Sequence, residues 1–342
     1  MDILSADIEE LKTYLKELGE KAFRADQLFG WLHKNGAVTY DEMTNLPASM
    51  REKLNEQAPL QRAVIETMQE SAIDGTRKYL FKLHDGYYIE SVFMRYQHGL
   101  TVCVSSQVGC RMGCRFCAST IGGLSRNLTA GEIVSQIEQI GRDVGERITN
   151  VVVMGTGEPL DNYDNLVRFI RLCSDPKGLG ISKRNITVST CGLVENIYRL
   201  ADEGMPINLA LSLHAPTDEK RQEIMPIAKK YPLRDVMEAM VYYFKKTGRR
   251  LTFEYSLIKG VNDSDQVVKD LSRLLRGKNA LINVIPVNPV REREFKDTSR
   301  PETEAFKKKL EKNGLHVTIR REMGRDIDGA CGQLRKKYIE TE

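Results

Sequence analysis

Segments typical of strands and of helices alternate along most of this chain, and this alternation limits the possible folds more than any other feature. Six short runs rich in Val, Ile, Leu and Thr are typical of strands, and amphipathic stretches separate them. The runs are at 100–106, 148–155, 185–190, 207–214, 251–258 and 281–287. Helices between successive strands predict a parallel sheet, which is either open and doubly wound or curved into a barrel.

Local signals mark where several of the connecting helices begin and end. Thr129 followed by Glu132 forms a capping box that predicts a helix start. Gly204 is placed to end another helix, and Pro301 is placed near the start of a third. Residues 315–321 predict one further strand before a short tail.

The first hundred residues differ from the rest of the chain. Apolar spacing near 3.6 predicts helices at 8–19 and 23–36, each ending at a glycine. Residues 76–96 alternate apolar and polar side chains around Asp85-Gly86, which predicts a β-hairpin. We therefore expect four parts: a helical accessory domain at 1–60, a β-hairpin linker at 61–98, a core barrel at 99–326 and a tail at 327–342 that carries Cys331.

The cysteine usage indicates a reducing compartment. The seven cysteines are an odd number, and three of them fall within eight residues, which fits metal or redox chemistry better than a disulfide framework. The start, MDILSADIEE, lacks the basic and apolar regions of a signal peptide, and no run of about 18 apolar residues occurs. We expect a cytoplasmic protein with no membrane partner.

The three clustered cysteines, Cys110, Cys114 and Cys117, follow the first strand of the repeated units. A four-iron, four-sulfur cluster held by three thiolates keeps one iron open for another ligand. A structural zinc ion is the alternative, but it needs four closed ligands and no second Cys or His pair lies near. The spacing therefore favours an iron–sulfur cluster.

Several residues with small or polar side chains lie where the predicted strands end. They are Gly157, Glu158, Ser189, Ser212, Leu213, His214 and Asn288. In a barrel of parallel strands the loops after the strands form the active site. Each residue alone is ordinary, since a serine at a strand end is usually a cap and a lone histidine is usually packed. Together they predict a ligand site beside the cysteine loop.

The CxxxCxxC spacing after the first strand resembles the signature of the radical S-adenosylmethionine (SAM) superfamily, and Gly157-Glu158 resembles its GGEP element. The resemblance implies a partial (β/α)6 TIM-like radical SAM barrel, here with a small N-terminal helical domain. It also implies that the open iron chelates SAM, that an electron from the cluster cleaves SAM to a 5'-deoxyadenosyl radical, and that the strand-end residues bind SAM.

Four cysteines lie outside the cluster motif. Cys173 and Cys191 have the spacing of small buried core residues. Cys103 lies within the first strand, and Cys331 lies in a stretch rich in Gly, Asp and Ala without apolar periodicity, which is typical of an accessible loop thiol.

Longer stretches resemble the RlmN family over almost the whole chain. They include SSQVGCRMGCRFCAST, GEPL, SLHAP, GVND and RREMGRDIDGACGQLR, with FRADQLFGWLHKNG and DEMTNLP near the start. The resemblance implies methylation of C2 of an adenine at the peptidyl-transferase centre of 23S ribosomal RNA, and in some members of the adenine 3' of the tRNA anticodon. It also implies two SAM molecules for each turnover.

The same resemblance implies catalytic roles for three residues. Cys331 takes a methyl group from one SAM and becomes S-methylcysteine, and a radical formed from the second SAM removes hydrogen from that methyl group. The carbon radical adds to adenine C2, Glu90 takes the C2 proton, and Cys103 releases the product by forming a transient disulfide with Cys331. The alternative for Glu90 is a solvent-facing carboxylate of the hairpin.

The partners implied by the resemblance are 23S ribosomal RNA, tRNA and a reductant such as flavodoxin. The net charge is +4, and residues 1–60 hold 7 Lys or Arg against 11 Asp or Glu. The excess of positive charge therefore lies after residue 60. Both RNA binding and an ordinary solvated surface are compatible with this distribution. Candidate phosphate contacts are Arg249, Arg250, Lys307, Lys308, Lys309, Arg320, Arg321, Arg335, Lys336 and Lys337.

Two rival functions stay open on the sequence alone. A Cfr-type enzyme uses the same cysteines but methylates adenine C8, and the GEPL and RREMG stretches favour RlmN over it. A non-catalytic RNA-binding protein with a structural metal ion is the second rival, and the combination of strand-end residues with Cys331 disfavours it.

Overall fold

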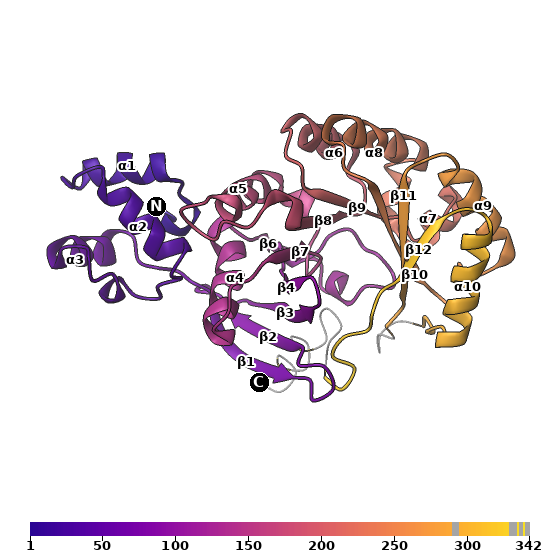
Figure 1. The fold of residues 1–342 in the computed structure, drawn as a ribbon, viewed down its shortest axis with the longest axis horizontal. Coiled ribbons are helices and arrows are strands. Elements are labelled where there is room, and N and C mark those ends of the chain that lie inside the picture. The colour runs from indigo at the N-terminus through magenta and orange to yellow at the C-terminus, as the bar shows by residue number, and fades with distance from the viewer. Residues whose placement is uncertain (289–293, 328–333, 335–337, 339–342) are drawn as a thin grey trace.

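The computed structural model describes residues 1–288, 294–327, 334 and 338. Its helical domain, its sheet and its connecting helices form one elongated molecule, with the helical domain at one end and α10 (Arg300–Lys312) at the other (Figure 1). No helix of the described residues is both long and apolar enough to cross a membrane.

Three helices form the N-terminal domain: α1 (Ile8–Glu17), α2 (Arg24–His33) and α3 (Ala48–Gln57). The two helices expected from the apolar spacing are confirmed, and the glycines at their ends, Gly19 and Gly36, have φ angles of 77° and 61°. Such positive φ angles suit glycine because it has no Cβ to clash. The domain lies beside α4 (Ala130–Val144) and α5 (Tyr163–Ser174) (Figure 1).

A buried charge cluster fastens this domain to α4. Glu138 of α4 accepts a hydrogen bond of 2.8 Å from the His33 ring, and it also forms an ion pair with Arg62. Arg62 in addition donates to the carbonyl of Leu32 at 2.6 Å. Burial raises the pKa of Glu138, but the charge of Arg62 and the His33 contact outweigh it and hold that pKa below its usual range. Glu138 is therefore a carboxylate at neutral pH.

We expect Glu138→Gln to lower the free energy of unfolding by about 3–5 kcal/mol, because the change leaves the Arg62 charge buried without its carboxylate. Denaturant unfolding at pH 7 measures the effect. The matched control is Glu146→Gln, which removes an exposed carboxylate from an ion pair with Arg95 and should change the free energy of unfolding little, because solvent screens such a pair. Equal effects of the two substitutions would contradict this account of the domain contact.

The pKa of Glu138 also gives the contact a pH dependence. Because this pKa is lower in the folded than in the unfolded chain, the ion cluster stabilises the fold fully above pH 4.5. That contribution is lost as the pH falls below 4.5 and through the folded-state pKa, so the difference between wild type and Glu138→Gln should shrink there.

Ten strands form one sheet in the order β1-β2-β3-β4-β7-β8-β9-β10-β11-β12. Their bounds are β1 (Val64–Glu70), β2 (Arg77–Lys82), β3 (Tyr88–Tyr96), β4 (Gly99–Cys103), β7 (Asn150–Val153), β8 (Ile186–Thr190), β9 (Asn208–Ser212), β10 (Leu251–Leu257), β11 (Ala280–Pro286) and β12 (His316–Ile319). The first four strands pair antiparallel, and the seven strands from β4 to β12 pair parallel. The six expected units and the expected final strand are confirmed.

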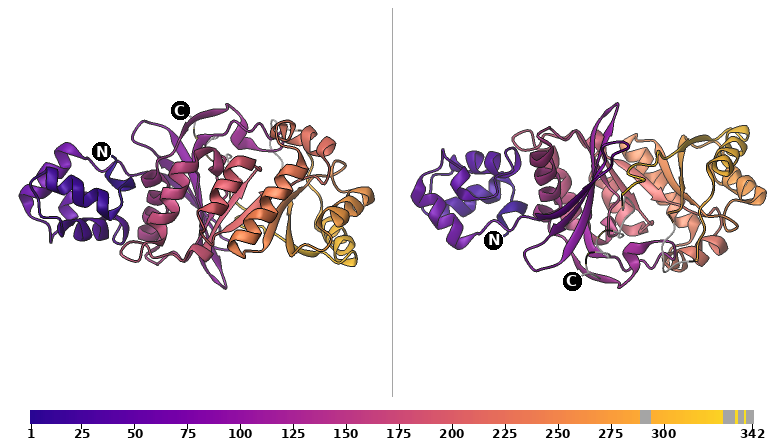
Figure 2. Two further views of the ribbon diagram at one scale, coloured as in Figure 1. Left: turned by 90° about the horizontal axis from the view of Figure 1, so that it is seen from above. Right: turned by 90° about the horizontal axis from the view of Figure 1, so that it is seen from below.

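Amphipathic helices connect the parallel strands. After α4 and α5 these are α6 (Val194–Asp202), α7 (Asp218–Ile224), α8 (Leu233–Thr247), α9 (Asp265–Leu275) and α10. The view from above shows connecting helices in front of the strands (Figure 2). At α4 the expected capping box is present, since Thr129 and Glu132 each bind the backbone N–H of the other. Within the described residues β1 and β12 pair with only one neighbour each, so the sheet is a partial barrel.

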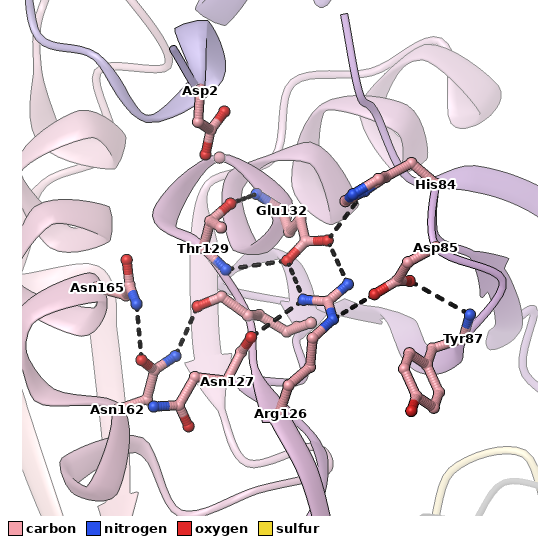
Figure 3. A network of polar contacts seen from close by, with 12 residues as sticks. Asp2, His84, Asp85, Tyr87, Arg126, Asn127, Thr129, Glu132, Asn162 and Asn165 are labelled. Carbon is pink, nitrogen blue, oxygen red and sulfur yellow. Dashed lines mark hydrogen bonds and ion pairs between the residues drawn. The ribbon is translucent and has the colours of Figure 1, made fainter.

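The hairpin of β2 and β3 is continuous with the main sheet, where β1 and β4 flank it. A polar network holds its tip against β6 (Leu124–Asn127) and the start of α4 (Figure 3). Arg126 contacts Asp85 at 2.5 Å and binds both carboxylate oxygens of Glu132 at 2.7 and 2.8 Å. Since β6 leaves the cysteine loop, the network fixes that loop relative to the hairpin that carries Glu90.

Candidate active site

The cysteine loop spans residues 110–123, between the short strands β5 (Gln107–Gly109) and β6. The backbone segments at the two ends of the loop lie close together. Gly109 has a φ of 80°, and a Cβ there would lie 2.0 Å from the Gly123 carbonyl oxygen. Within the loop the Thr120 hydroxyl donates to the carbonyls of Cys114 and Cys117 at 3.1 and 2.9 Å. Hydrogen bonds within the loop therefore fix the backbone around Cys114 and Cys117.

One cavity collects the three clustered cysteines and most of the strand-end residues. Its lining comprises Cys110, Met112, Cys114, Phe116, Cys117, Ser119, Thr120, Val153, Met154, Gly155, Gly157, Glu158, Ser189, Cys191, Ser212, His214, Met225, Glu254, Ile285 and Arg320. The lining residues come from the cysteine loop, from β7 to β11 with the residues that follow these strands, and from Met225 and Arg320. Most of them lie at strand ends, as expected for a barrel of parallel strands.

The cysteines themselves fit an iron–sulfur cluster. All three line one cavity, where Cys110 is buried and Cys114 and Cys117 are half-buried. Three thiolates in one cavity suit a cluster, because each can bind a different iron and leave the fourth iron for another ligand.

Burial also affects the protonation of these cysteines. Burial raises the pKa of Cys110 to about 12, and burial with the charge of Cys117 raises the pKa of Cys114 as well. At neutral pH both sulfurs would be thiols in the absence of a cation, and bound iron would hold them as thiolates.

Gly157 and Glu158 form a turn that packs against the start of the cysteine loop. Gly157 has a φ of 113°, and a Cβ there would lie 2.7 Å from the Ser106 hydroxyl, so only glycine fits. The buried Glu158 carboxylate accepts from the backbone N–H groups of Leu160 at 3.0 Å and Cys191 at 2.8 Å. Burial nevertheless raises the pKa of Glu158 above its usual range. The side chains of Thr190 and Cys191 also hydrogen-bond this carboxylate.

Ser189 and Ser212 lie side by side at the ends of β8 and β9, with their hydroxyl oxygens 3.2 Å apart. His214 follows with a φ of 53°, unusual for a residue other than glycine. Its Nδ1 accepts a hydrogen bond of 2.9 Å from the Ser256 N–H. Burial, with the charge of Arg221, lowers the pKa of His214 to about 3. The ring is therefore neutral with its proton on Nε2, which makes it a hydrogen-bond donor.

The structure does not bring two of the expected cofactor residues to the cavity. Leu213 is fully buried in the core, and its carbonyl accepts from Arg221 at 3.3 Å. Asn288 lies two residues beyond the end of β11 and is exposed. Their assignment to the cofactor stays a prediction. Cys331 lies outside the described residues, as do Arg335, Lys336 and Lys337.

Three ionisable cavity residues were not among the expected cofactor ligands. Glu254 lies in the middle of β10, where burial raises its pKa and Asn283 donates to it at 2.9 Å. Arg320, expected at a phosphate, lies at the cavity next to β12. Cys191, expected in the core, is buried at the cavity wall. A charged residue within an apolar strand, as in LTFEYSLI, is the signal that could have identified Glu254.

Glu90 lies inside the protein. Its side chain is 3% exposed and pairs at 2.9 Å with Lys78, which is fully buried on β2. Lys78 and Cys103 both lie opposite Val92 in the register, and Glu90 is two residues before Val92 on β3. Alternate side chains share a face, so Lys78, Glu90 and Cys103 project from the same face of the sheet. The solvent-facing alternative for Glu90 is wrong.

We expect Lys78→Met to lower RNA methylation on the order of 10²-fold, because the substitution removes a cation from a buried carboxylate that is assigned as the base. Methylation rates of the cluster-loaded proteins at neutral pH measure it. The control is Lys82→Met, at an exposed position of the same strand, and equal rates for both variants would contradict a role for Lys78.

Comparison with known proteins agrees with this geometry. The radical SAM superfamily matches residues 104–271, and the ribosomal RNA large subunit methyltransferase N-terminal domain matches residues 1–60. A probable dual-specificity RNA methyltransferase RlmN of Lachnospira eligens is 57% identical over 339 residues, which cover 99% of this chain and 97% of that protein. The protein of the same name from Geobacillus kaustophilus is 52% identical, with coverages of 99% and 94%.

A solved structure extends the comparison. The crystal structure of a radical SAM methyltransferase from Sphaerobacter thermophilus has a TM-score of 0.93 and 42% sequence identity to this chain, and the match covers 97% of this chain and 98% of that one. The fold expected from the sequence, a partial radical SAM barrel with a helical N-terminal domain, is thereby confirmed. The chain belongs to the RlmN family of the radical SAM superfamily.

Proposed function

We propose that this protein methylates C2 of the peptidyl-transferase-centre adenine in 23S ribosomal RNA and C2 of the adenine 3' of the tRNA anticodon. Membership of the RlmN family supports this function. The observation that carries it is the single cavity where the three clustered cysteines meet the turn at Gly157 and Glu158 and the ends of β8 and β9.

The proposed cofactors have distinct binding groups in the chain. Cys110, Cys114 and Cys117 would hold a 4Fe-4S cluster, which supplies the electron for SAM cleavage when it is bound. Glu158, which lines the cavity beside the clustered cysteines, would bind the SAM ammonium group. Ser189, Ser212 and the Nε2–H of His214 would supply further polar contacts.

The proposed chemistry needs a cysteine that carries the methyl group. Adenine C2 lies between two ring nitrogens and is electron-poor, so it cannot attack the SAM methyl group directly. Cys331 takes that methyl group first, in the manner of nucleophilic covalent catalysis. Hydrogen removal then turns the S-methyl group into a carbon radical that adds to C2 and links the RNA to Cys331. The adduct radical must lose one electron, for which the bound cluster would be the acceptor.

Release of the methylated base uses the residues on β3 and β4. Glu90 takes the proton from C2, and Lys78 holds its carboxylate in place at 2.9 Å. The Cys103 sulfur attacks the sulfur of Cys331, which breaks the carbon–sulfur bond to the base and forms a disulfide. The released methylene carbon takes up one proton and becomes the methyl group. Cellular thiols reduce that disulfide for the next turnover. We place the reaction in the cytoplasm, with flavodoxin as the proposed electron donor.

Mass spectrometry of nucleosides tests the proposed function. Ribosomal RNA and tRNA are incubated without oxygen with the cluster-loaded protein, SAM and a reductant. We expect 2-methyladenosine from both RNAs. 8-Methyladenosine would move the protein to the Cfr type, and 2-methyladenosine from ribosomal RNA alone would remove tRNA as a substrate. Bound zinc with no affinity for SAM would favour a non-catalytic RNA-binding protein.

A further inference from the structure

A buried arginine lies beneath the cavity. Arg221 on α7 is 0% exposed and is among the largest fully buried side chains of the described residues. Its Nη2 donates to the carbonyls of Cys191 at 2.6 Å and Ser212 at 3.3 Å, and its Nε donates to the carbonyl of Leu213 at 3.3 Å. The guanidinium therefore lies directly behind the residues that end β8 and β9.

The charge of Arg221 is not matched by a carboxylate. Within the described residues no carboxylate forms an ion pair with Arg221, Asp218 on the same helix influences its charge only from a longer distance, and its third nitrogen, Nη1, is buried without a hydrogen-bond partner. A buried donor without a partner costs about 1–3 kcal/mol, and a buried charge without a counter-charge costs more. Burial of this cation destabilises the fold unless a negative group lies beside it in the cluster-loaded protein.

The cysteine loop lies near Arg221 and, with a bound cluster, would supply this negative charge. The Arg115 N–H, next to Cys114, donates at 2.9 Å to the Ile224 carbonyl at the end of α7. Met225, the next residue, lines the cavity. Arg221 binds the carbonyls of Cys191 and Ser212, which line the same cavity as Cys114. Arg221 thus lies behind the wall of the cavity that would hold the cluster.

We propose that Arg221 is a positioning residue that acts through the cluster: its positive charge stabilises the reduced cluster and raises the cluster's reduction potential. The inference rests on the proposed function, because it requires the cluster at Cys110, Cys114 and Cys117. Reduction adds one electron and hence one negative charge next to the guanidinium. A fixed cation in a buried environment favours the more negative state, and net charge near a cluster is one of the factors that set its potential.

Two substitutions separate charge from hydrogen bonding. Arg221→Lys keeps the positive charge, and Arg221→Gln keeps donors for the carbonyls but removes the charge. The cluster midpoint potential is measured by titration with reductant while the electron paramagnetic resonance signal of the reduced cluster is recorded. We expect a more negative midpoint for Arg221→Gln and a midpoint close to wild type for Arg221→Lys. Arg234→Gln, which removes an exposed arginine, is the control and should leave the midpoint unchanged.

A second measurement covers variants that load the cluster poorly. Thermal unfolding is compared between the loaded and the cluster-free protein. The cluster should raise the unfolding temperature of wild type and Arg221→Lys by more than that of Arg221→Gln, because the favourable contact between cation and cluster is lost only in the glutamine variant. A purely structural role predicts equal losses of stability in both forms of Arg221→Gln.

The outcomes also separate this inference from the proposed function. A wild-type protein that takes up no iron and sulfide would overturn both. A wild-type protein with a reducible cluster, whose midpoint and stability gain are the same in Arg221→Gln, would overturn the role of Arg221 alone. A midpoint in Arg221→Lys shifted as far as that in Arg221→Gln would also overturn it, because charge would not be the cause.

Discussion

We expect Cys331→Ala to abolish RNA methylation while the protein still binds its cluster and still cleaves SAM. The expected result follows from the substrate, because adenine C2 cannot attack the SAM methyl group and therefore depends on a methyl group already carried by the protein. Without the Cys331 sulfur, the protein carries no methyl group from which hydrogen can be removed. The loss should reach the detection limit of nucleoside mass spectrometry.

The matched control is Cys173→Ala, which removes another cysteine without touching the cavity. Cys173 is fully buried on α5, and burial raises its pKa well above the usual range, so it is an unreactive core thiol. This variant should keep its activity. Any 2-methyladenosine formed by Cys331→Ala would show that the methyl group does not pass through this cysteine.

The second large effect is expected for Cys103→Ala, which should leave the protein covalently joined to its RNA. Cys103 lies at the end of β4, opposite Val92 and on the same face as Glu90. Its sulfur is assigned to attack Cys331 and release the methylated base. Without it the chemistry proceeds to the linked intermediate and stops there.

Denaturing gel electrophoresis measures the trapped species as RNA that migrates with the protein. Nuclease digestion should leave one methylene-linked adenosine on the tail peptide that contains Cys331. Cys173→Ala again serves as the control and should show no linked RNA. Free 2-methyladenosine from Cys103→Ala in multiple turnovers would refute the role assigned to Cys103.

The parallel part of the fold could be predicted from sequence because each unit is defined locally. Runs of β-branched and aliphatic residues mark the strands, and capping signals such as Thr129 with Glu132 mark helix starts. A right-handed helical connection then places successive strands next to one another, which gives the observed order from β4 to β12. Strand β1 gave a weaker signal, because it lies at the sheet edge and alternates exposed with half-buried residues.

The part of the site that could be predicted was the part with a local pattern. The cysteine spacing and the strand-end position of Glu158 are visible in the sequence itself. Lys78, Glu254 and Arg221 were missed because their importance depends on burial, which is set by distant segments. A lysine in RKYLFK is ordinary on a solvated hairpin, and only the pairing of β2 with β3 places it beside Glu90.

The roles of the basic residues also depend on contacts that the sequence does not show. Sequence suggested a set of phosphate contacts, but several of them bind protein groups in the fold. Lys309 pairs with Asp265 at 2.6 Å, Lys307 pairs with Glu311 at 3.7 Å, and Arg249 donates to Asn208. Arg250 and Arg321 are exposed and stay candidates for RNA contact.

The most direct test of the account follows deuterium from the SAM methyl group over several turnovers. SAM with three deuterium atoms on its methyl group is supplied, and the product methyl group and 5'-deoxyadenosine are analysed by mass spectrometry. Methyl transfer through Cys331, with hydrogen removal before addition to C2, predicts two deuterium atoms in the product methyl group and one in 5'-deoxyadenosine. A product methyl group with all three deuterium atoms would mean direct transfer and would contradict the account.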